Sequence, residues 1–220
     1  MRLQRGVMVF FSVLGLMVAA AASAAPLPKA TAAPTSTASR TVLVLGDSLS
    51  AGYGITASQG WVALTARKMA ASHPGWRVVN ASISGETTAG GASRIAAELK
   101  RHRPAVVVVE LGANDGLRGL PLAQTRANLE RIVRLSQRAG ARVLLLGMRM
   151  PPNFGPAYTR GFEANYVELS RQYRTGLLPF FLEPVMNDRA NFQPDNLHPT
   201  AAAQPRLRDH VWPRLAALLK

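Results

Sequence analysis

Short apolar runs alternate with longer amphipathic segments along most of this chain, and this alternation restricts the possible folds more than any other feature. The predicted strands are residues 41–45, 77–80, 105–111, 142–147 and 177–182. Apolar residues recur every three or four positions in the other segments, which predicts helices at 60–72, 88–102, 122–139, 157–173 and 201–220. Uninterrupted apolar strands that alternate with helices indicate a parallel sheet covered on both faces. We therefore predict one α/β domain, a doubly wound three-layer α/β/α sandwich.

Glycine and proline residues indicate where some of these elements end or become irregular. Gly140 is well placed to end the third helix. Pro179 makes the fifth strand less regular, because proline has no N–H to donate within a sheet. In the C-terminal segment, Pro205 suits the first turn of a helix, and Pro213 is expected to kink or break it.

The first 24 residues have the pattern of a secretory signal peptide. Arg2 and Arg5 precede an apolar run at 7–22, and Ala22-Ser23-Ala24 offers a cleavage site after Ala24. The alternative is an uncleaved membrane anchor, which is disfavoured because a membrane span needs about 20 residues. Residues 25–40 are rich in Ala, Pro, Ser and Thr and predict a flexible tether. We expect a periplasmic or secreted protein whose folded domain is 41–220.

The chain is strongly basic, with a formal net charge of +14. Arg2, Arg5, Lys29 and Arg40 precede the domain, which leaves it 22 basic and 12 acidic residues, a net charge of +10. The arginines of 126–142 are spaced like the polar face of an amphipathic helix. No nucleic-acid-binding motif accompanies them, so we expect no nucleic-acid partner. A weak association with anionic membrane surfaces stays compatible with this charge.

The chain contains no cysteine. This excludes disulfide bonds, a thiolate nucleophile and any metal site that needs cysteine ligands. A serine-based mechanism is then the natural choice for nucleophilic catalysis.

Polar or glycine-containing segments follow all five predicted strands. They are residues 46–50, 82–87, 112–116, 150–155 and, a little later, 195–199. Ligands of open parallel sheets bind where the strands end at their carboxyl edge. We therefore expect these segments to form the functional site.

These segments contain the groups that hydroxyl-based acyl transfer requires. Ser48, in a tight turn after the first strand, is the candidate nucleophile, and His198 is the candidate base. Asp195 comes three residues before His198 and could orient its ring. Gly85 could supply an unobstructed backbone N–H, and the Asn114 amide a second donor, for the oxyanion that forms.

Each residue also has an ordinary interpretation. Aspartate and serine commonly cap helices, and Asp47 is expected to brace its turn. Asp195 and His198 could form a capped turn or supply two ligands of a metal, but no third ligand lies near them in sequence. Asn114 could be a turn residue, and Asp115 is expected to brace its own loop. The combination of segments in order at one sheet edge favours catalysis.

Four blocks of the chain resemble those of the SGNH hydrolases, also called the GDSL esterase and lipase family. The blocks are Gly46-Asp47-Ser48-Leu49-Ser50-Ala51-Gly52-Tyr53-Gly54, Ser84-Gly85-Glu86, Gly112-Ala113-Asn114-Asp115 and Asp195-Asn196-Leu197-His198-Pro199. The resemblance covers essentially all of 41–220. Within the family, it is closest to the branch of bacterial periplasmic enzymes with acyl-CoA thioesterase, arylesterase and lysophospholipase activity.

The resemblance implies a flavodoxin-like sandwich with a five-stranded parallel sheet. It implies that Ser48, Asp195 and His198 are catalytic, and that Ser48, Gly85 and Asn114 form the oxyanion hole. It also implies that the loop at 150–158, which includes Phe154, borders the acyl pocket.

We therefore interpret the chain as a serine hydrolase of acyl esters and thioesters that works through an acyl-enzyme on Ser48. We expect a monomer that needs no cofactor or metal and acts on small acyl substrates. Two alternatives remain open: a carbohydrate O-deacetylase with the same catalytic groups, and a non-catalytic lipid-binding domain. The sequence leaves acyl length, leaving group and the choice between ester and thioester undetermined.

Overall fold

The computed structural model describes residues 40–220. The predicted signal peptide at 1–24 and nearly all of the tether at 25–40 lie outside the described residues. Among residues 40–220, every helix is too short or too polar to cross a bilayer.

The centre of the domain is a five-stranded sheet in which every paired neighbour runs parallel. Its order is β2-β1-β3-β4-β5. The strands are β1 (Arg40–Gly46), β2 (Trp76–Asn80), β3 (Val106–Glu110), β4 (Arg142–Leu146) and β5 (Gly176–Leu178). The Val and Leu runs of β1, β3 and β4 are buried on both faces, as a covered parallel sheet requires. The prediction of a five-stranded parallel α/β sandwich is confirmed.

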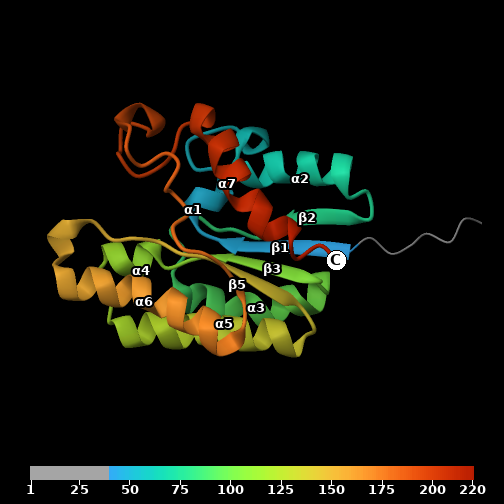
Figure 1. Cartoon of the computed structure of the whole chain (residues 1–220), viewed down its shortest axis with the longest axis horizontal. Helices are drawn as coiled ribbons and strands as arrows, with labels where there is room; N and C mark the ends of the chain where they lie inside the picture. Colours follow the sequence, from blue (N-terminus) through green and yellow to red (C-terminus); the bar gives the residue numbers. More distant parts are fainter. Residues whose placement is uncertain (1–39) are drawn as a thin grey trace, which may run out of the picture. The chain divides into compact units, whose positions relative to one another are not determined.

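Helices cover both faces of the sheet. The α-helices are α1 (Ser48–Ala51), α2 (Trp61–Ser72), α3 (Thr88–His102), α4 (Ala113–Leu117), α5 (Leu122–Arg138), α6 (Pro156–Tyr173) and α7 (Gln204–Ala216). The 3₁₀ turns are η1 (Ala57–Gln59), η2 (Pro152–Phe154), η3 (Arg189–Asn191) and η4 (Ala201–Ala203). In Figure 1, α2 and α7 lie on one face, and α3, α5 and α6 lie on the other.

Helix α5 has one buried apolar face and one exposed polar face, as its amphipathic pattern predicts. Leu129, Ile132 and Val133 are completely buried in the core. Arg131 and Arg134 are exposed on the opposite side. The predicted polar face is therefore a solvated surface of the molecule.

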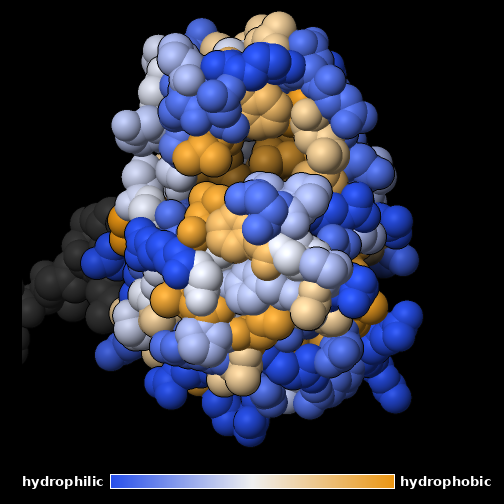
Figure 2. Space-filling model, turned by 90° about the vertical axis from the view of Figure 1, so that its left-hand side faces the viewer, coloured by the Kyte–Doolittle hydropathy of each residue, from blue (hydrophilic) through white to orange (hydrophobic). Residues whose placement is uncertain are grey.

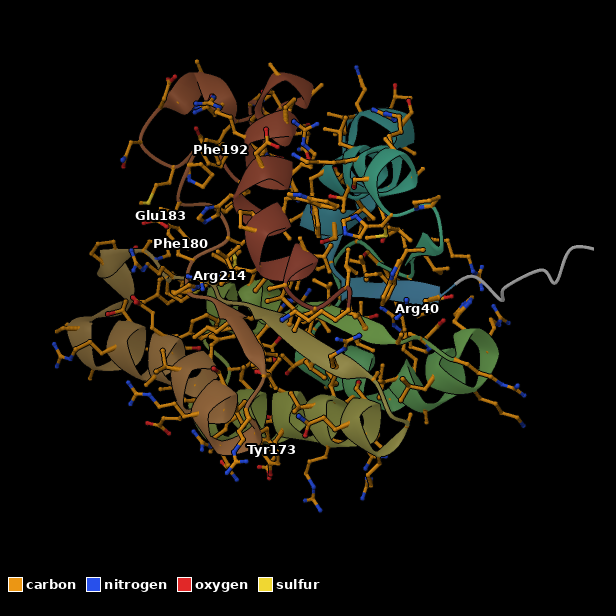
Figure 3. All side chains as sticks on the ribbon, turned by 45° about the vertical axis from the view of Figure 1, so that its right-hand side comes forward. Arg40, Tyr173, Phe180, Glu183, Phe192 and Arg214 are labelled. Carbon is orange, nitrogen blue, oxygen red and sulfur yellow. The ribbon has the colours of Figure 1, made fainter. Side chains whose placement is uncertain are left out.

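The predicted fifth strand was too long. It covers Gly176–Leu178, because Pro179 has no N–H with which to continue the ladder. The chain then turns across the sheet edge, where Phe181 N donates to Gly147 O at 2.9 Å and the Phe181 ring is buried. Figure 3 labels Phe180, Glu183 and Phe192 on the long segment that follows and that leads to α7.

The C-terminal helix was also predicted with different bounds. The 3₁₀ turn η4 precedes α7, which starts at Gln204, and the helix ends at Ala216 instead of Lys220. Pro205 lies in the first turn, as expected, and Pro213 is accommodated inside the helix. The bounds of α2, α5 and α6 differ from prediction by one residue, and those of α3 match it, whereas the short helices α1 and α4 were not predicted.

Candidate active site

Ser48 begins α1, directly after β1 ends at the carboxyl edge of the sheet. The buried carboxylate of Asp47 caps this short helix, because its Oδ1 accepts the Leu49 N–H at 3.0 Å. The turn is too tight for a side chain at position 46, where an added Cβ would lie 2.7 Å from Ser50 Cβ. Asp47 thus braces the turn as expected, and Ser48 is held at the sheet edge.

Ser48, His198 and Asp195 form one hydrogen-bonded chain. His198 Nε2 lies 2.8 Å from Ser48 Oγ, and His198 Nδ1 lies 2.7 Å from Asp195 Oδ2. The other Asp195 oxygen accepts the backbone N–H groups of His198 at 3.0 Å and Leu197 at 2.9 Å. The backbone N–H of His198, then that of Leu197 and the His198 ring, lower the pKa of Asp195 to about 2. The carboxylate therefore stays ionised at neutral pH and can orient the imidazole.

The loop that carries His198 is fixed from two sides. Within it, Gln193 N donates to His198 O at 2.8 Å. Across the site, Gln193 Nε2 donates to Tyr53 O at 2.8 Å. The Tyr53 ring lies against the His198 imidazole, with centroids 4.5 Å apart and an angle of 39° between the planes. These contacts connect the turn after β1 to the loop before α7, although 150 positions separate Ser48 from His198.

Gly85 and Asn114 lie beside Ser48 and border the same cavity. Gly85 has a φ of +79°, a backbone conformation that favours glycine. Asn114 Nδ2 donates to Glu86 O at 3.0 Å and to Asp47 Oδ2 at 3.2 Å. Both hydrogens of this amide therefore have an acceptor in the free protein. A substrate oxygen would share or replace one of these acceptors.

A second buried carboxylate, that of Glu110, lies behind the Ser48 turn. Its Oε2 accepts a hydrogen bond from Ser50 Oγ at 2.7 Å and one from Asp47 N at 3.4 Å. Its Oε1 is buried without a hydrogen-bond partner.

Burial raises the pKa of both carboxyl groups in this turn. Burial, opposed by hydrogen bonds, raises the pKa of Asp47 to about 6. Burial, and then the nearby charge of Asp47, raise the pKa of Glu110 well above its ordinary value. Burial therefore favours the neutral form of Glu110 over its ionised form. The sequence analysis missed it, although a glutamate that ends an apolar strand was a usable signal.

The Asp115 side chain braces neighbouring elements, whereas it was expected to brace its own loop. Its side chain accepts hydrogen bonds from Thr88 N at 2.8 Å, from Thr88 Oγ1, and from Thr125 Oγ1 at 3.4 Å. It therefore connects the start of α3 to α5. The expectation was wrong, because the hydrogen-bond donors to the Asp115 side chain come from neighbouring helices and not from its own loop.

An apolar cavity of about 560 Å³ opens beside Ser48. Figure 2 views this edge of the sheet and shows a hollow with an orange, apolar lining. Its apolar lining includes Met148, Met150 and Pro151 after β4, and Leu182 and Met186 after β5. Phe154 is not among the lining residues, and its ring instead packs against Tyr158 with centroids 6.0 Å apart. The predicted loop does border the cavity, but through its first residues.

Across residues 40–220, the structure contains no cluster of three or more His, Cys, Asp or Glu side chains that could hold a metal ion. His198 bonds to Asp195 through Nδ1 and to Ser48 through Nε2. Their arrangement fits proton transfer to and from a hydroxyl nucleophile.

Comparison with known proteins places this geometry among acyl hydrolases. The model of the GDSL-like lipase/acylhydrolase family matches residues 44–205. The esterase TesA of Pseudomonas aeruginosa is 50% identical over 182 residues, which are 83% of this chain and 90% of that protein. The thioesterase 1/protease 1/lysophospholipase L1 of Escherichia coli K12 is 43% identical over 182 residues, which are 83% of this chain and 86% of that protein.

A solved structure gives the same result for the fold. The crystal structure of TesA superposes with a TM-score of 0.79 at 50% sequence identity. The match covers 81% of this chain and 99% of that one.

Proposed function

This chain belongs to the GDSL-like lipase/acylhydrolase family and is a serine hydrolase of esters and thioesters, and from this premise we propose that Ser48, His198 and Asp195 perform the hydrolysis. The observation that carries the proposal is the continuous hydrogen-bonded chain from Ser48 Oγ through His198 to Asp195. Because the chain is an enzyme, the alternative of a non-catalytic lipid-binding domain is wrong.

In the first half-reaction, His198 Nε2 takes the proton of Ser48 Oγ while that oxygen attacks the acyl carbonyl carbon. Asp195 stabilises the imidazolium that forms. The tetrahedral intermediate collapses as His198 gives the proton to the leaving alcohol or thiol. The acyl group is then bound to Ser48 as an ester.

In the second half-reaction, water attacks the acyl-enzyme. His198 takes a proton from the water and returns it to Ser48 Oγ as the acid leaves. The net reaction consumes one water and releases a carboxylic acid and an alcohol or thiol. The protein needs no cofactor for these steps.

The oxyanion of each intermediate is assigned to the backbone N–H groups of Ser48 and Gly85 and to the Asn114 amide. Asn114 is already held at the site by Asp47 and Glu86. A donor that is positioned before the reaction can stabilise the developing charge once the substrate oxygen shares or replaces one of its acceptors.

The cavity supports an acyl chain as the part of the substrate that is bound. Most of its lining is apolar, and three methionines contribute to it: Met148, Met150 and Met186. Methionine side chains adapt to ligands of different shapes. We propose that aryl esters, acyl-CoA thioesters and lysophospholipids are all substrates. A large apolar cavity does not favour the alternative of a carbohydrate O-deacetylase, because an acetyl group would occupy little of it.

We also propose where the enzyme is located and how it associates. The basic, apolar and Ala-Ser-Ala pattern of residues 1–24 supports export to the periplasm or the medium. We propose that the exported enzyme is a monomer and that the net charge of +10 on 41–220 favours weak association with anionic membranes.

The test is a hydrolysis panel on the processed protein and on its Ser48→Ala variant. The panel compares aryl esters, acyl-CoA thioesters and lysophospholipids with short, medium and long acyl chains. Ser48→Ala should lower kcat at least about 1,000-fold on every substrate. Ser93→Ala is the matched control, because Ser93 is exposed on α3 and bonds only to Gly90 O in its own helix.

The panel also separates the alternatives. Activity that survives Ser48→Ala on every substrate would contradict the mechanism. Activity restricted to acetyl esters of carbohydrates would favour the O-deacetylase instead.

A further inference from the structure

The exposed large apolar side chains of residues 40–220 are concentrated around one opening. They are Tyr53 (53% exposed), Ile83 (51%), Leu117 (40%), Met186 (48%) and Leu197 (49%). We call this set the apolar rim. Four of the five also line the cavity beside Ser48, and Ile83 is next to Ser84, which lines it too.

The apolar rim is built from five separate parts of the chain. Tyr53 follows α1, Ile83 follows β2, and Leu117 ends α4. Met186 belongs to the segment after β5, and Leu197 to the loop that carries His198. Five independent segments thus each expose an apolar side chain at the same mouth. In Figure 2, orange surface lies in and beside the hollow on this face, while blue surface surrounds it.

The substrate cavity alone does not account for this exposure. A side chain that serves only the interior of a pocket is covered by the opposite wall, whereas each rim residue keeps about half of its surface in water. Contiguous exposed apolar surface that is bordered by polar residues is characteristic of docking sites.

Two cations at the same mouth lack an anionic partner within the described part of the chain. Arg118 Nη2 donates to Gly85 O at 3.3 Å, and Arg189 donates to the carbonyl oxygens of Phe192 and Pro194. Neither guanidinium forms an ion pair there, unlike Arg149, whose Nε is 3.1 Å from Glu163 Oε2.

The nearby carboxylates are satisfied within their own loops. Asp188 accepts the N–H of Ala190 at 2.9 Å. Asp195 is bonded to the His198 ring and to two backbone N–H groups. The mouth therefore combines apolar side chains with two available guanidinium groups. This chemistry is complementary to a layer of acyl chains beneath phosphate groups.

We propose that the apolar rim docks onto the surface of an anionic phospholipid membrane, with Arg118 and Arg189 at the level of the lipid phosphates. The proposal rests on the proposed acyl hydrolase function, because docking would place the cavity mouth against the acyl chains. A lipid substrate would then enter the cavity acyl chain first, directly from the lipid phase.

The test measures binding to vesicles of phosphatidylcholine alone and of phosphatidylcholine mixed with phosphatidylglycerol, at low and high salt. The proteins carry Ser48→Ala so that the lipid is not hydrolysed. Ile83→Ser should weaken partitioning about five- to tenfold, as expected when a half-exposed isoleucine no longer transfers into an apolar phase. Val167→Ser is the matched control, because Val167 is a partly exposed residue of α6 that lies away from the mouth.

The contribution of the arginines to vesicle binding can be measured separately from that of the apolar rim. Partitioning should be tighter to the vesicles with phosphatidylglycerol, and this preference should decrease at high salt. Arg189→Gln should reduce the preference about fivefold, whereas Arg171→Gln, an exposed arginine on α6, should leave it unchanged.

An activity measurement with native Ser48 separates docking from catalysis. Ile83→Ser should hydrolyse a dissolved short-chain aryl ester like the unmodified enzyme and should lose rate only on lysophospholipid that is presented in vesicles. Equal partitioning of Ile83→Ser and Val167→Ser, or no vesicle binding by the unmodified protein, would overturn the proposal. So would a dimer that Ile83→Ser converts to a monomer, since the rim would then be an interface between two copies. A failure of the catalytic proposal would appear instead as ester hydrolysis that survives Ser48→Ala.

Discussion

Asn114 Nδ2 donates a 3.2 Å hydrogen bond to Asp47 Oδ2, so that the proposed oxyanion donor is held by the carboxylate that caps the Ser48 helix. One buried group thus positions both the nucleophile turn and the amide that faces it. Glu110, behind Asp47, accepts the Ser50 hydroxyl of the same turn.

Asn114→Ala should lower kcat about 100-fold or more and should change KM little, because the amide acts on charge that develops after binding. The measurement is steady-state kinetics on an aryl ester, with circular dichroism to check the fold. An unchanged kcat would remove Asn114 from the oxyanion hole.

Glu110→Gln should fold and remain active, because burial raises the pKa of Glu110 and so favours its neutral form, and because glutamine preserves an acceptor for Ser50 Oγ. Glu110→Ala should lower the free energy of unfolding by about 2–4 kcal/mol, since it leaves a cavity and a buried hydroxyl without a partner. Urea unfolding of the two variants provides the comparison. Equal destabilisation by both would mean that an ionised carboxylate is required at this position.

Asp47 should make the protein less stable as the pH rises from about 4 to about 6. Its pKa is raised in the folded state from 3.8 to about 6, so in this range the folded protein holds a proton that the unfolded chain has lost. The stabilisation is complete below pH 3.8 and is lost as the pH rises through 6. Urea unfolding at several pH values should show a flatter dependence for Asp47→Asn than for the unmodified protein. An identical slope for both would contradict the assignment.

Tyr53→Ala should lower kcat about five- to tenfold, because the Tyr53 ring lies against the His198 imidazole and helps to hold its orientation. Tyr53→Phe keeps the ring and is the matched control. Kinetics on a dissolved short-chain ester isolate this effect from any effect on lipid docking. If the phenylalanine variant lost as much as the alanine variant, the hydroxyl and not the ring contact would be responsible.

Gly116→Ala should shift the preference toward shorter acyl chains by about tenfold in relative kcat/KM. A Cβ at position 116 would lie 2.2 Å from Met150 Sδ, so the flexible Met150 side chain must move, and the cavity that it lines is expected to narrow. The double variant Gly116→Ala with Met150→Ala should restore hydrolysis of long chains. If the double variant keeps the short-chain preference, Met150 does not transmit the effect.

The sequence was sufficient for the layers and for the residues that meet at the sheet edge. Strands and helices differ in how often buried apolar residues recur along the chain, and this period can be read directly from the sequence. The pairing of Ser48 with His198 also followed, because each lies in a segment at the carboxyl side of the sheet.

Relationships that depend on how helices pack together, or on how deeply a polar side chain is buried, were not predicted. Asp115 was assigned to its own loop, but Thr88 and Thr125 come from helices whose packing the sequence does not state. Glu110 was overlooked because the sequence gives no measure of its complete burial. The fifth strand was extended past Pro179 because hydrophobicity continues there, although hydrogen bonding in the ladder does not.

Lys220 lies at the edge of the sheet opposite the cavity. Its backbone oxygen accepts hydrogen bonds of 2.8 Å from Arg40, which begins β1, and from Arg142, which begins β4. Enzyme that is coupled to a solid support through this residue should therefore face outward, with its mouth open to dissolved esters and to vesicles alike. Immobilisation at the other edge, for example through a cysteine introduced at position 83, should block both.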